Sequence, residues 1–133
     1  MIELGKIYNE DCLETMRRMP DGFVDLVVTS PPYDGLRSYD GYLSWDFASV
    51  ARELGRILKI GGILVWIVGD QTLNGSETGQ SFRQALFFSD FLNWHDTMIY
   101  HKTGLTFPEI TRYYPAFEYM FVFSKGKPKT INL

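Results

Sequence analysis

The residues best suited to chemistry in this sequence are Ser30, Pro31, Pro32 and Tyr33, which directly follow a short apolar run. The Ser30 hydroxyl and the Pro31 carbonyl can accept hydrogen bonds, and the two proline rings fix the φ angles that aim that carbonyl. Tyr33 adds an aromatic face beside these acceptors. A plain proline turn with Tyr33 packed nearby explains the four residues equally well, so the surrounding elements must decide.

The motif follows a predicted strand. The apolar run at 26–28 is β-branched at two positions and is typical of a strand buried on both faces. Neither proline can donate to a sheet ladder, so the strand must stop where the motif begins. In open α/β sheets, ligands bind at the carboxyl ends of the strands, which is where these polar groups are expected.

Apolar periodicity and turn residues divide the rest of the chain into strands, helices and loops. We expect strands at 4–8, 23–29, 63–68, 94–102 and 117–124, helices at 12–19, 45–59 and 81–93, and loops at 34–44, 73–79 and 103–116. Asn9 or Asp11 can cap the first helix, and Gly61 can end the second in a left-handed conformation. The alternation predicts an α/β fold: a mostly parallel sheet, helices on both faces, and an antiparallel pair from the last two strands.

Composition and charge limit the possible classes of protein. The 133 residues suffice for one domain, and no apolar run could span a membrane. The single cysteine, Cys12, allows no internal disulfide, so we expect a cytoplasmic protein. The net charge of −3 disfavours a chain that wraps nucleic acid by itself, and any phosphate contacts are expected from the five bases within 101–133. His95 and His101 match no metal-ligand spacing, so no metal is expected.

Residues 30–33 resemble motif IV of the DNA amino-methyltransferases, and other segments match that family in order. Residues 9–14 resemble motif III, residues 57–62 resemble motif V running into motif VI, and residues 117–126 resemble motif VIII. This order is that of the permuted beta class. The resemblance implies a partial Rossmann-like fold of the S-adenosylmethionine-dependent methyltransferases, with residues 1–133 forming a single catalytic-half domain.

The resemblance also implies a reaction, the transfer of a methyl group from S-adenosylmethionine to an exocyclic amine of DNA. That amine is a poor nucleophile because its lone pair is delocalised into the ring. Ser30 and the Pro31 carbonyl would hold its two N–H groups and turn the lone pair toward the methyl donor. Tyr33 would stack on a base flipped out of double-stranded DNA. Serine before Pro-Pro favours cytosine as the target, with adenine as the alternative.

Further site residues follow from the same resemblance. Asp11, Cys12 and Thr29 would bind S-adenosylmethionine, and Phe117 and Glu118 would lie near the target base. Each has a structural alternative as well. Asp11 can be a helix cap, Phe117 an aromatic residue of an edge strand, and Glu118 a surface acid.

One departure from the family pattern affects the whole interpretation. The Gly-rich loop Phe-x-Gly-x-Gly, which binds the methionine part of the cofactor, is absent, as is a target-recognition region. We therefore expect an N-terminal portion of a larger enzyme, a truncated gene, or one subunit of a split enzyme whose second chain carries the loop. A protein glutamine methyltransferase and a remnant that kept the fold without activity remain alternatives.

Overall fold

The structure is a computed structural model that describes residues 1–32, 45–104 and 111–132. Tyr33 and the predicted loop at 34–44 lie outside the described residues, as does part of the predicted loop at 103–116. The described elements are α1 (Cys12–Arg17), β1 (Val24–Thr29), α2 (Phe47–Ile57), β2 (Leu58–Val68), β3 (Thr72–Leu73), β4 (Ser76–Glu77), α3 (Gln80–Ser89), β5 (Asn93–His101) and β6 (Phe117–Ser124).

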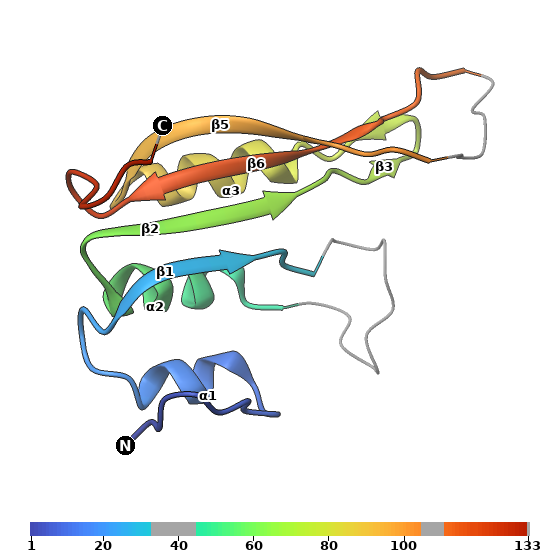
Figure 1. Cartoon of the computed structure of the whole chain (residues 1–133). Helices are drawn as coiled ribbons and strands as arrows, with labels where there is room; N and C mark the ends of the chain where they lie inside the picture. Colours follow the sequence, from blue (N-terminus) through green and yellow to red (C-terminus); the bar gives the residue numbers. More distant parts are fainter. Residues whose placement is uncertain (33–44, 105–110, 133) are drawn as a thin grey trace.

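The main sheet has the strand order β1-β2-β6-β5 (Figure 1). β1 and β2 are parallel, while β6 runs antiparallel to both of its neighbours, β2 and β5. β1, β2 and β5 therefore share one direction, and β5 and β6 form an antiparallel pair at one edge. This arrangement confirms the predicted α/β class.

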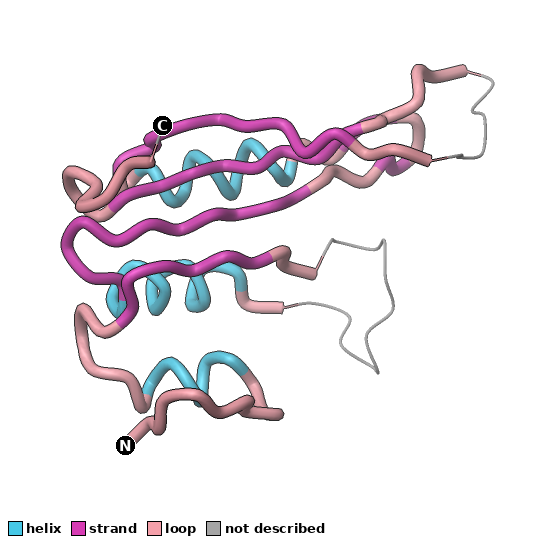
Figure 2. The backbone as a smooth tube through the Cα atoms, in the orientation of Figure 1, coloured by secondary structure: helices cyan, strands magenta, loops and turns pink. Residues whose placement is uncertain are grey.

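The helices cover one face of this sheet. Figure 2 shows α2 and α3 behind the strands, and α1 packs against α2. On the helix side, Leu64, Trp66 and Val68 of β2 are almost fully buried. On the other side, Leu26 and Val28 of β1 are 57% and 59% exposed. The prediction of helices on both faces is therefore wrong for the described chain, and so is the prediction that β1 is buried on both faces.

Trp66 is the centre of the buried layer between sheet and helices. Its ring lies 4.9 Å from Phe88 of α3 and 5.9 Å from Phe47 of α2, measured between centroids. Its indole Nε1 donates a hydrogen bond to Gln84 Oε1 at 2.9 Å, within the core. The buried indole donor and the amide oxygen that accepts from it are thus paired, which offsets the cost of burying them.

Several predicted elements differ from the structure: the helix expected at 81–93 ends at Ser89, the strand expected at 63–68 begins at Leu58, and the loop expected at 73–79 contains the β3–β4 hairpin. The first strand and the glycine cap differ as well. Residues 4–8 form no strand; Leu4 is 82% and Ile7 99% exposed, and Tyr8 Oη instead accepts a hydrogen bond from the Glu3 amide at 2.8 Å. Gly61 has the expected positive φ of 84°, but α2 already ends at Ile57 and Gly61 lies within β2. There the pairing with β1 shifts register, so the glycine accommodates an irregularity in the strand and does not cap the helix.

Two basic side chains fasten the ends of α1 and α2. Arg56 of α2 donates to the carbonyls of Met16 and Met19 at 2.7 and 2.9 Å, which lie at the C-terminal end of α1. Lys125 Nζ, just after β6, donates to the carbonyls of Gly55 and Leu58 at 2.8 and 2.9 Å. Carbonyls at a helix C-terminus lack partners within the helix, so these two cations supply hydrogen-bond donors to them. Their positive charges also interact favourably with the negative end of the helix dipole.

Candidate functional site

The residues after β1 leave the sheet at the edge where β2 also ends. Thr29 pairs with Trp66, so Ser30 and Pro31 follow β1 as Ile67 and Val68 complete β2. Pro31 is buried and Pro32 half-buried, while Ser30 is exposed. Burial fixes the proline segment against the protein and leaves the serine facing solvent, as a residue that contacts a ligand requires. Tyr33, the fourth residue of the motif, lies outside the described residues.

Phe117 and Glu118 reach the same edge from the opposite direction. β6 begins at Phe117 and is antiparallel to β2, with Tyr119 opposite Val68. The start of β6 therefore adjoins the end of β2. The structure thus brings Thr29, Ser30, Phe117 and Glu118 to one edge of the sheet, although sequence separates the two pairs by almost ninety residues.

Asp11 and Cys12 lie at the start of α1, on the side of the molecule at which β1 ends (Figure 1). Asp11 Oδ1 accepts the Leu13 amide at 2.8 Å, which confirms Asp11 as the helix cap. Among the described residues Oδ2 has no partner and could accept from a hydroxyl of a ligand. The pKa of the Cys12 thiol is raised, first by lost hydration and then by the Asp11 carboxylate. A neutral thiol and a carboxylate oxygen are therefore adjacent at the start of α1.

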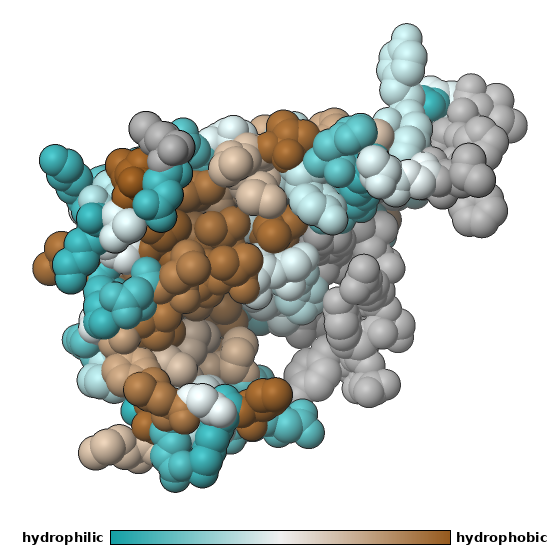
Figure 3. Space-filling view, viewed as in Figure 1, coloured by the Kyte–Doolittle hydropathy of each residue, from teal (hydrophilic) through white to brown (hydrophobic). Residues whose placement is uncertain are grey.

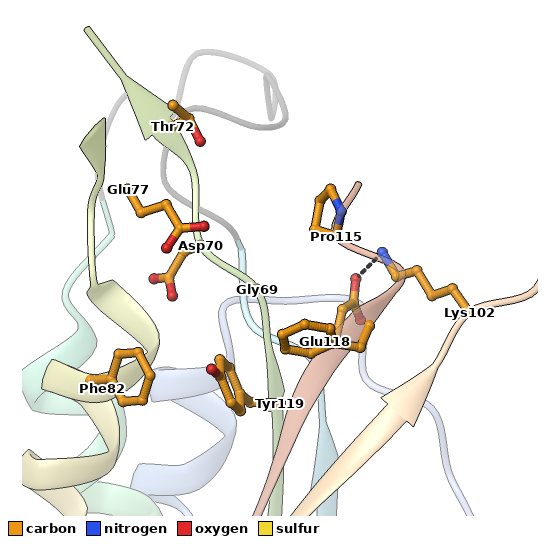
Figure 4. Close-up of a pocket in the computed structure, with 10 residues that line it drawn as sticks. Gly69, Asp70, Thr72, Glu77, Phe82, Lys102, Pro115, Glu118 and Tyr119 are labelled. Carbon is orange, nitrogen blue, oxygen red and sulfur yellow. Dashed lines mark ion pairs between the residues drawn. The ribbon is translucent and has the colours of Figure 1, made fainter. Parts of the chain in front are cut away.

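A pocket of about 380 Å³ opens here (Figure 4). It lies between the end of β2, the start of β6, the β3–β4 hairpin and the start of α3. This volume is in the range of small-ligand sites. Its lining combines aromatic rings with carboxylates: Phe82, Phe117, Tyr119, Asp70, Glu77 and Glu118, together with Gly69, Thr72, Lys102 and Pro115. Tyr119 joins the rings, with its centroid 5.1 Å from that of Phe82 and 5.3 Å from that of Phe117.

Three of the charged side chains that line the pocket, Lys102, Glu118 and Asp70, are held by other groups. Lys102 Nζ lies 2.6 Å from Glu118 Oε1, and the Glu118 side chain is only 15% exposed. Asp70 accepts hydrogen bonds from the amide and the hydroxyl of Ser81, at 2.8 and 2.5 Å. The carboxylates outnumber the single lysine, so the pocket disfavours a phosphate. Aromatic rings beside hydrogen-bond acceptors suit a flat group with N–H donors.

Sequence reasoning missed several residues of this pocket. Glu77 falls within the predicted loop at 73–79 and Phe82 within the predicted helix at 81–93, but Asn74 and Gly75 have φ values of 49° and 79° and close the β3–β4 hairpin. An Asn-Gly pair is a strong signal for such a two-residue turn, and it stood in the sequence. Lys102 and Tyr119 carried no comparable signal, because their roles come from partners distant in sequence.

Three of the five bases within 101–133 are engaged inside the molecule. Lys102 pairs with Glu118, Lys125 binds the end of α2, and Arg112 donates to the carbonyl of Gly75. The described structure therefore narrows the predicted source of phosphate contacts to Lys127 and Lys129, which are exposed.

These features define an α/β protein with a pocket of aromatic rings and carboxylates where its parallel strands β1 and β2 end. The chain matches the model of the DNA methylase family N6_N4_Mtase over residues 24–133, and it belongs to that family. The predicted resemblance to the DNA amino-methyltransferases is thereby confirmed. The family covers both N6 and N4 enzymes.

The individual relatives that the chain resembles include methyltransferases. The chain is 62% identical over 114 residues to the orphan methyltransferase M.BamHII of Bacillus amyloliquefaciens, covering 85% of this chain and 43% of the relative. It is 34% identical to the type II methyltransferase M.BamHI of the same species, covering 98% of this chain and 31% of the relative. The chain therefore spans less than half the length of these two relatives.

Solved structures share the fold. A Thermus thermophilus protein described as a DNA modification methylase, in complex with S-adenosyl-L-methionine, superposes with a TM-score of 0.68 at 25% identity, covering 92% of this chain and 55% of that one. The cytosine-N4-specific PvuII DNA methyltransferase gives a TM-score of 0.75 at 23% identity, covering 92% and 50%. Separately, the described helices include none long and apolar enough to cross a membrane.

Proposed function

We propose that this chain is the catalytic half of an S-adenosylmethionine-dependent DNA methyltransferase that acts on the exocyclic amine of cytosine. The observation that carries the proposal is that Ser30 and Pro31 follow β1 at the same end of the sheet at which the aromatic and carboxylate pocket opens. Membership of the DNA methylase family supports the reaction. Serine before Pro-Pro favours cytosine, and adenine is the second candidate.

In this proposal each site residue has its own task. Ser30 Oγ and the Pro31 carbonyl accept the two N–H groups of the amine, so that its lone pair points toward the methyl group. Phe117, with Tyr33, stacks on a base flipped out of double-stranded DNA, and Glu118 accepts from its polar edge. S-adenosylmethionine supplies the electrophilic methyl group when it is bound, held in this chain by Asp11, Cys12 and Thr29.

The cofactor cleft needs more than these three residues. A Phe-x-Gly-x-Gly loop is not found in the sequence, and we assign it to a complementary half supplied by a further polypeptide segment. The 133 residues alone should then show no methyl transfer above background, because the two reactants are not held in line. Clear transfer by the purified chain would contradict this division of the site.

The test is to supply the complementary half, incubate with methyl-labelled S-adenosylmethionine and mixed DNA, and identify the labelled nucleoside by mass spectrometry. We expect N4-methylcytosine. Detection of N6-methyladenine instead would show that the target is adenine, the second candidate. A complex that binds the cofactor and DNA but labels no nucleoside would overturn the proposed function.

A further inference from the structure

Lys102 and Glu118 form an ion pair in the lining of the pocket, with Lys102 Nζ 2.6 Å from Glu118 Oε1. The pairing of β5 with β6 brings them together, because Tyr100 lies opposite Glu118 and the Lys102 amide donates to the Ala116 carbonyl at 2.8 Å. The Glu118 side chain is only 15% exposed, whereas that of Lys102 is 42% exposed. The carboxylate is thus the member that depends on its partner, since a poorly hydrated charge needs an opposite charge beside it.

The other carboxylates of the pocket increase this dependence. Asp70 and Glu77 line the same pocket, and Lys102 is the one cation among its described lining residues. Figure 4 shows Asp70 and Glu77 on one side of the pocket and the Lys102–Glu118 pair on the other. Asp70 is already bonded to Ser81. Without Lys102, repulsion from two like charges would favour turning the Glu118 carboxylate out toward solvent.

The ion pair leaves one oxygen of Glu118 available to a ligand. Lys102 is bonded to Oε1, and within the part of the chain that the structure describes Oε2 has no partner. In a cytosine or adenine nucleotide, the exocyclic amine carries the only N–H groups of the base. A fixed carboxylate oxygen in this pocket is therefore suited to that amine.

The pocket and the motif after β1 lie at one end of the sheet but are separate places. Ser30 and Pro31 are outside the described lining of the pocket. Because β2 lies between β1 and β6, two strand spacings, about 10 Å, separate those two strands. Figure 3 shows that hydrophobic residues gather over the strands on this side of the sheet, where they offer the amine no alternative acceptor. A base that enters the pocket would therefore meet Glu118 before it meets Ser30.

We propose that Lys102 is a positioning residue, which holds Glu118 in the orientation that binds the amine of the target base as the base enters the pocket. Ser30 and Pro31 then accept the N–H groups of the amine for methyl transfer. The proposal rests on the proposed function for the identity of the base. It assigns entry of the base and the reaction itself to different residues, so the two steps can be measured separately.

The test uses this chain together with the part of the M.BamHII orphan methyltransferase that it does not match. Fluorescence anisotropy measures the affinity for mixed-sequence duplex DNA in the presence of S-adenosylhomocysteine, which has no methyl group to transfer. Lys102→Met should weaken binding by about tenfold, because the carboxylate loses its fixed orientation. The rate of methyl transfer at saturating DNA should stay close to native. Lys102→Arg keeps the charge and its donors and should restore affinity.

A double-mutant cycle tests whether Lys102 acts through Glu118. Glu118→Gln should weaken binding as Lys102→Met does, and adding Lys102→Met to Glu118→Gln should have little further effect. Lys59→Met is the matched control and should bind as the native chain does. Lys59 also forms an ion pair, 2.7 Å from Asp25, and is 41% exposed, but it lies at the start of β2, at the opposite end of the sheet. Circular dichroism shows that each variant is folded, and Lys102→Gln replaces Lys102→Met if that variant is not.

Three outcomes would overturn the positioning role. These are native affinity in Lys102→Met, failure of Lys102→Arg to restore the affinity, or a loss of equal size when Lys102→Met is added to Glu118→Gln. The third outcome, combined with a weaker dependence of Kd on salt, would show that Lys102 contacts a phosphate itself. A complex that shows the expected coupling but labels no nucleoside would overturn the proposed function and leave the positioning role standing.

Discussion

Ser30 lies between strand β1, which precedes it, and the proline rings of Pro31 and Pro32, which follow it. Its backbone is positioned by β1, whose last residue pairs with Trp66 in the core, and by the buried Pro31 that follows. Little backbone freedom is left at this point, so the position of the serine is set before any ligand arrives. A group that is already in position can stabilise a transition state without first having to be reorganised.

In the complete enzyme, we predict that Ser30→Ala lowers turnover while leaving DNA affinity nearly unchanged. Loss of one oriented hydrogen bond to the reacting group typically lowers the rate by about a hundred- to a thousandfold. Single-turnover methylation and DNA-binding titrations measure the two effects separately. Ser89→Ala is the matched control, because Ser89 bonds only to the Leu86 carbonyl on α3. Unchanged turnover in Ser30→Ala would remove this strand end from the catalytic site.

At the scale of elements, the attachment of α1 depends on one side chain of α2. Arg56 Nη1 and Nη2 reach two carbonyls at the end of α1, while Glu53 and Asp21 hold the guanidinium in place. These hydrogen bonds raise the pKa of Arg56, with Glu53 as the largest cause. Because Asp11 and Cys12 are at the other end of α1, the same contact fixes the expected cofactor residues relative to the sheet.

We predict that Arg56→Met lowers the free energy of unfolding by roughly 2–3 kcal/mol, since the hydrogen bonds that a charged donor makes to the Met16 and Met19 carbonyls are lost. Urea unfolding followed by circular dichroism measures this. Arg83→Met, the same change at an exposed position of α3, should stay close to the native value. Equal stability of both variants would show that α1 is held by apolar packing alone.

The elements also show what the sequence could and could not predict. Apolar periodicity located α1, α2, α3 and the strands of the main sheet, because each buries a regular stripe against the same core. It failed at residues 4–8, which have no neighbouring strand in the described structure. It also placed the end of α2 too late, because an apolar residue such as Leu58 fits a helix or a strand. The end of β1 at Thr29 was predictable, because the prolines that follow it cannot donate to a sheet ladder. The Lys102–Glu118 pair was not, since it depends on how β5 and β6 come together.

The molecule as a whole carries carboxylates that folding holds in their charged form. Hydrogen bonds lower the pKa of Glu10 through Arg18 and then Thr15, of Asp46 through Ser49, and of Glu53 through Arg56. The native state therefore binds fewer protons than the unfolded chain in acid. Their stabilisation is complete above the ordinary values of 3.8 for Asp and 4.5 for Glu and is lost as pH falls below them.

We accordingly predict a urea midpoint that is level at neutral pH and decreases on acidification below these values. Because the carboxylates are near the surface, added salt should reduce the decrease. Urea titrations at several pH values, with and without salt, test this. Glu10→Gln should show a shallower dependence than the native chain. A midpoint that rises in acid would contradict the assigned directions.

Net charge and its distribution determine how the whole chain meets DNA. The chain carries −3 overall, and Lys102, Arg112 and Lys125 already bind groups of the protein itself. Among the bases of 101–133 only Lys127 and Lys129 then remain for phosphates, and each phosphate contact contributes to affinity by releasing counterions. The aromatic and carboxylate pocket can hold a base but does not attract a phosphate backbone. Most of the phosphate contacts should therefore come from the complementary half.

We predict that the chain alone binds duplex DNA no more tightly than non-specific binding, with Kd of about 10⁻⁴ to 10⁻⁶ M at physiological salt. Fluorescence anisotropy with one duplex at low and moderate salt should show that Kd depends only weakly on salt concentration. The reason is that, of the bases within 101–133, only Lys127 and Lys129 are exposed and make no described side-chain bond. Changing both to Gln should flatten it further, whereas Lys6→Gln, near the exposed N-terminus and paired with Glu3, should not. Adding the complementary half should tighten binding and steepen the dependence. Tight, sequence-selective binding by the 133 residues alone would instead place the recognition elements within this chain.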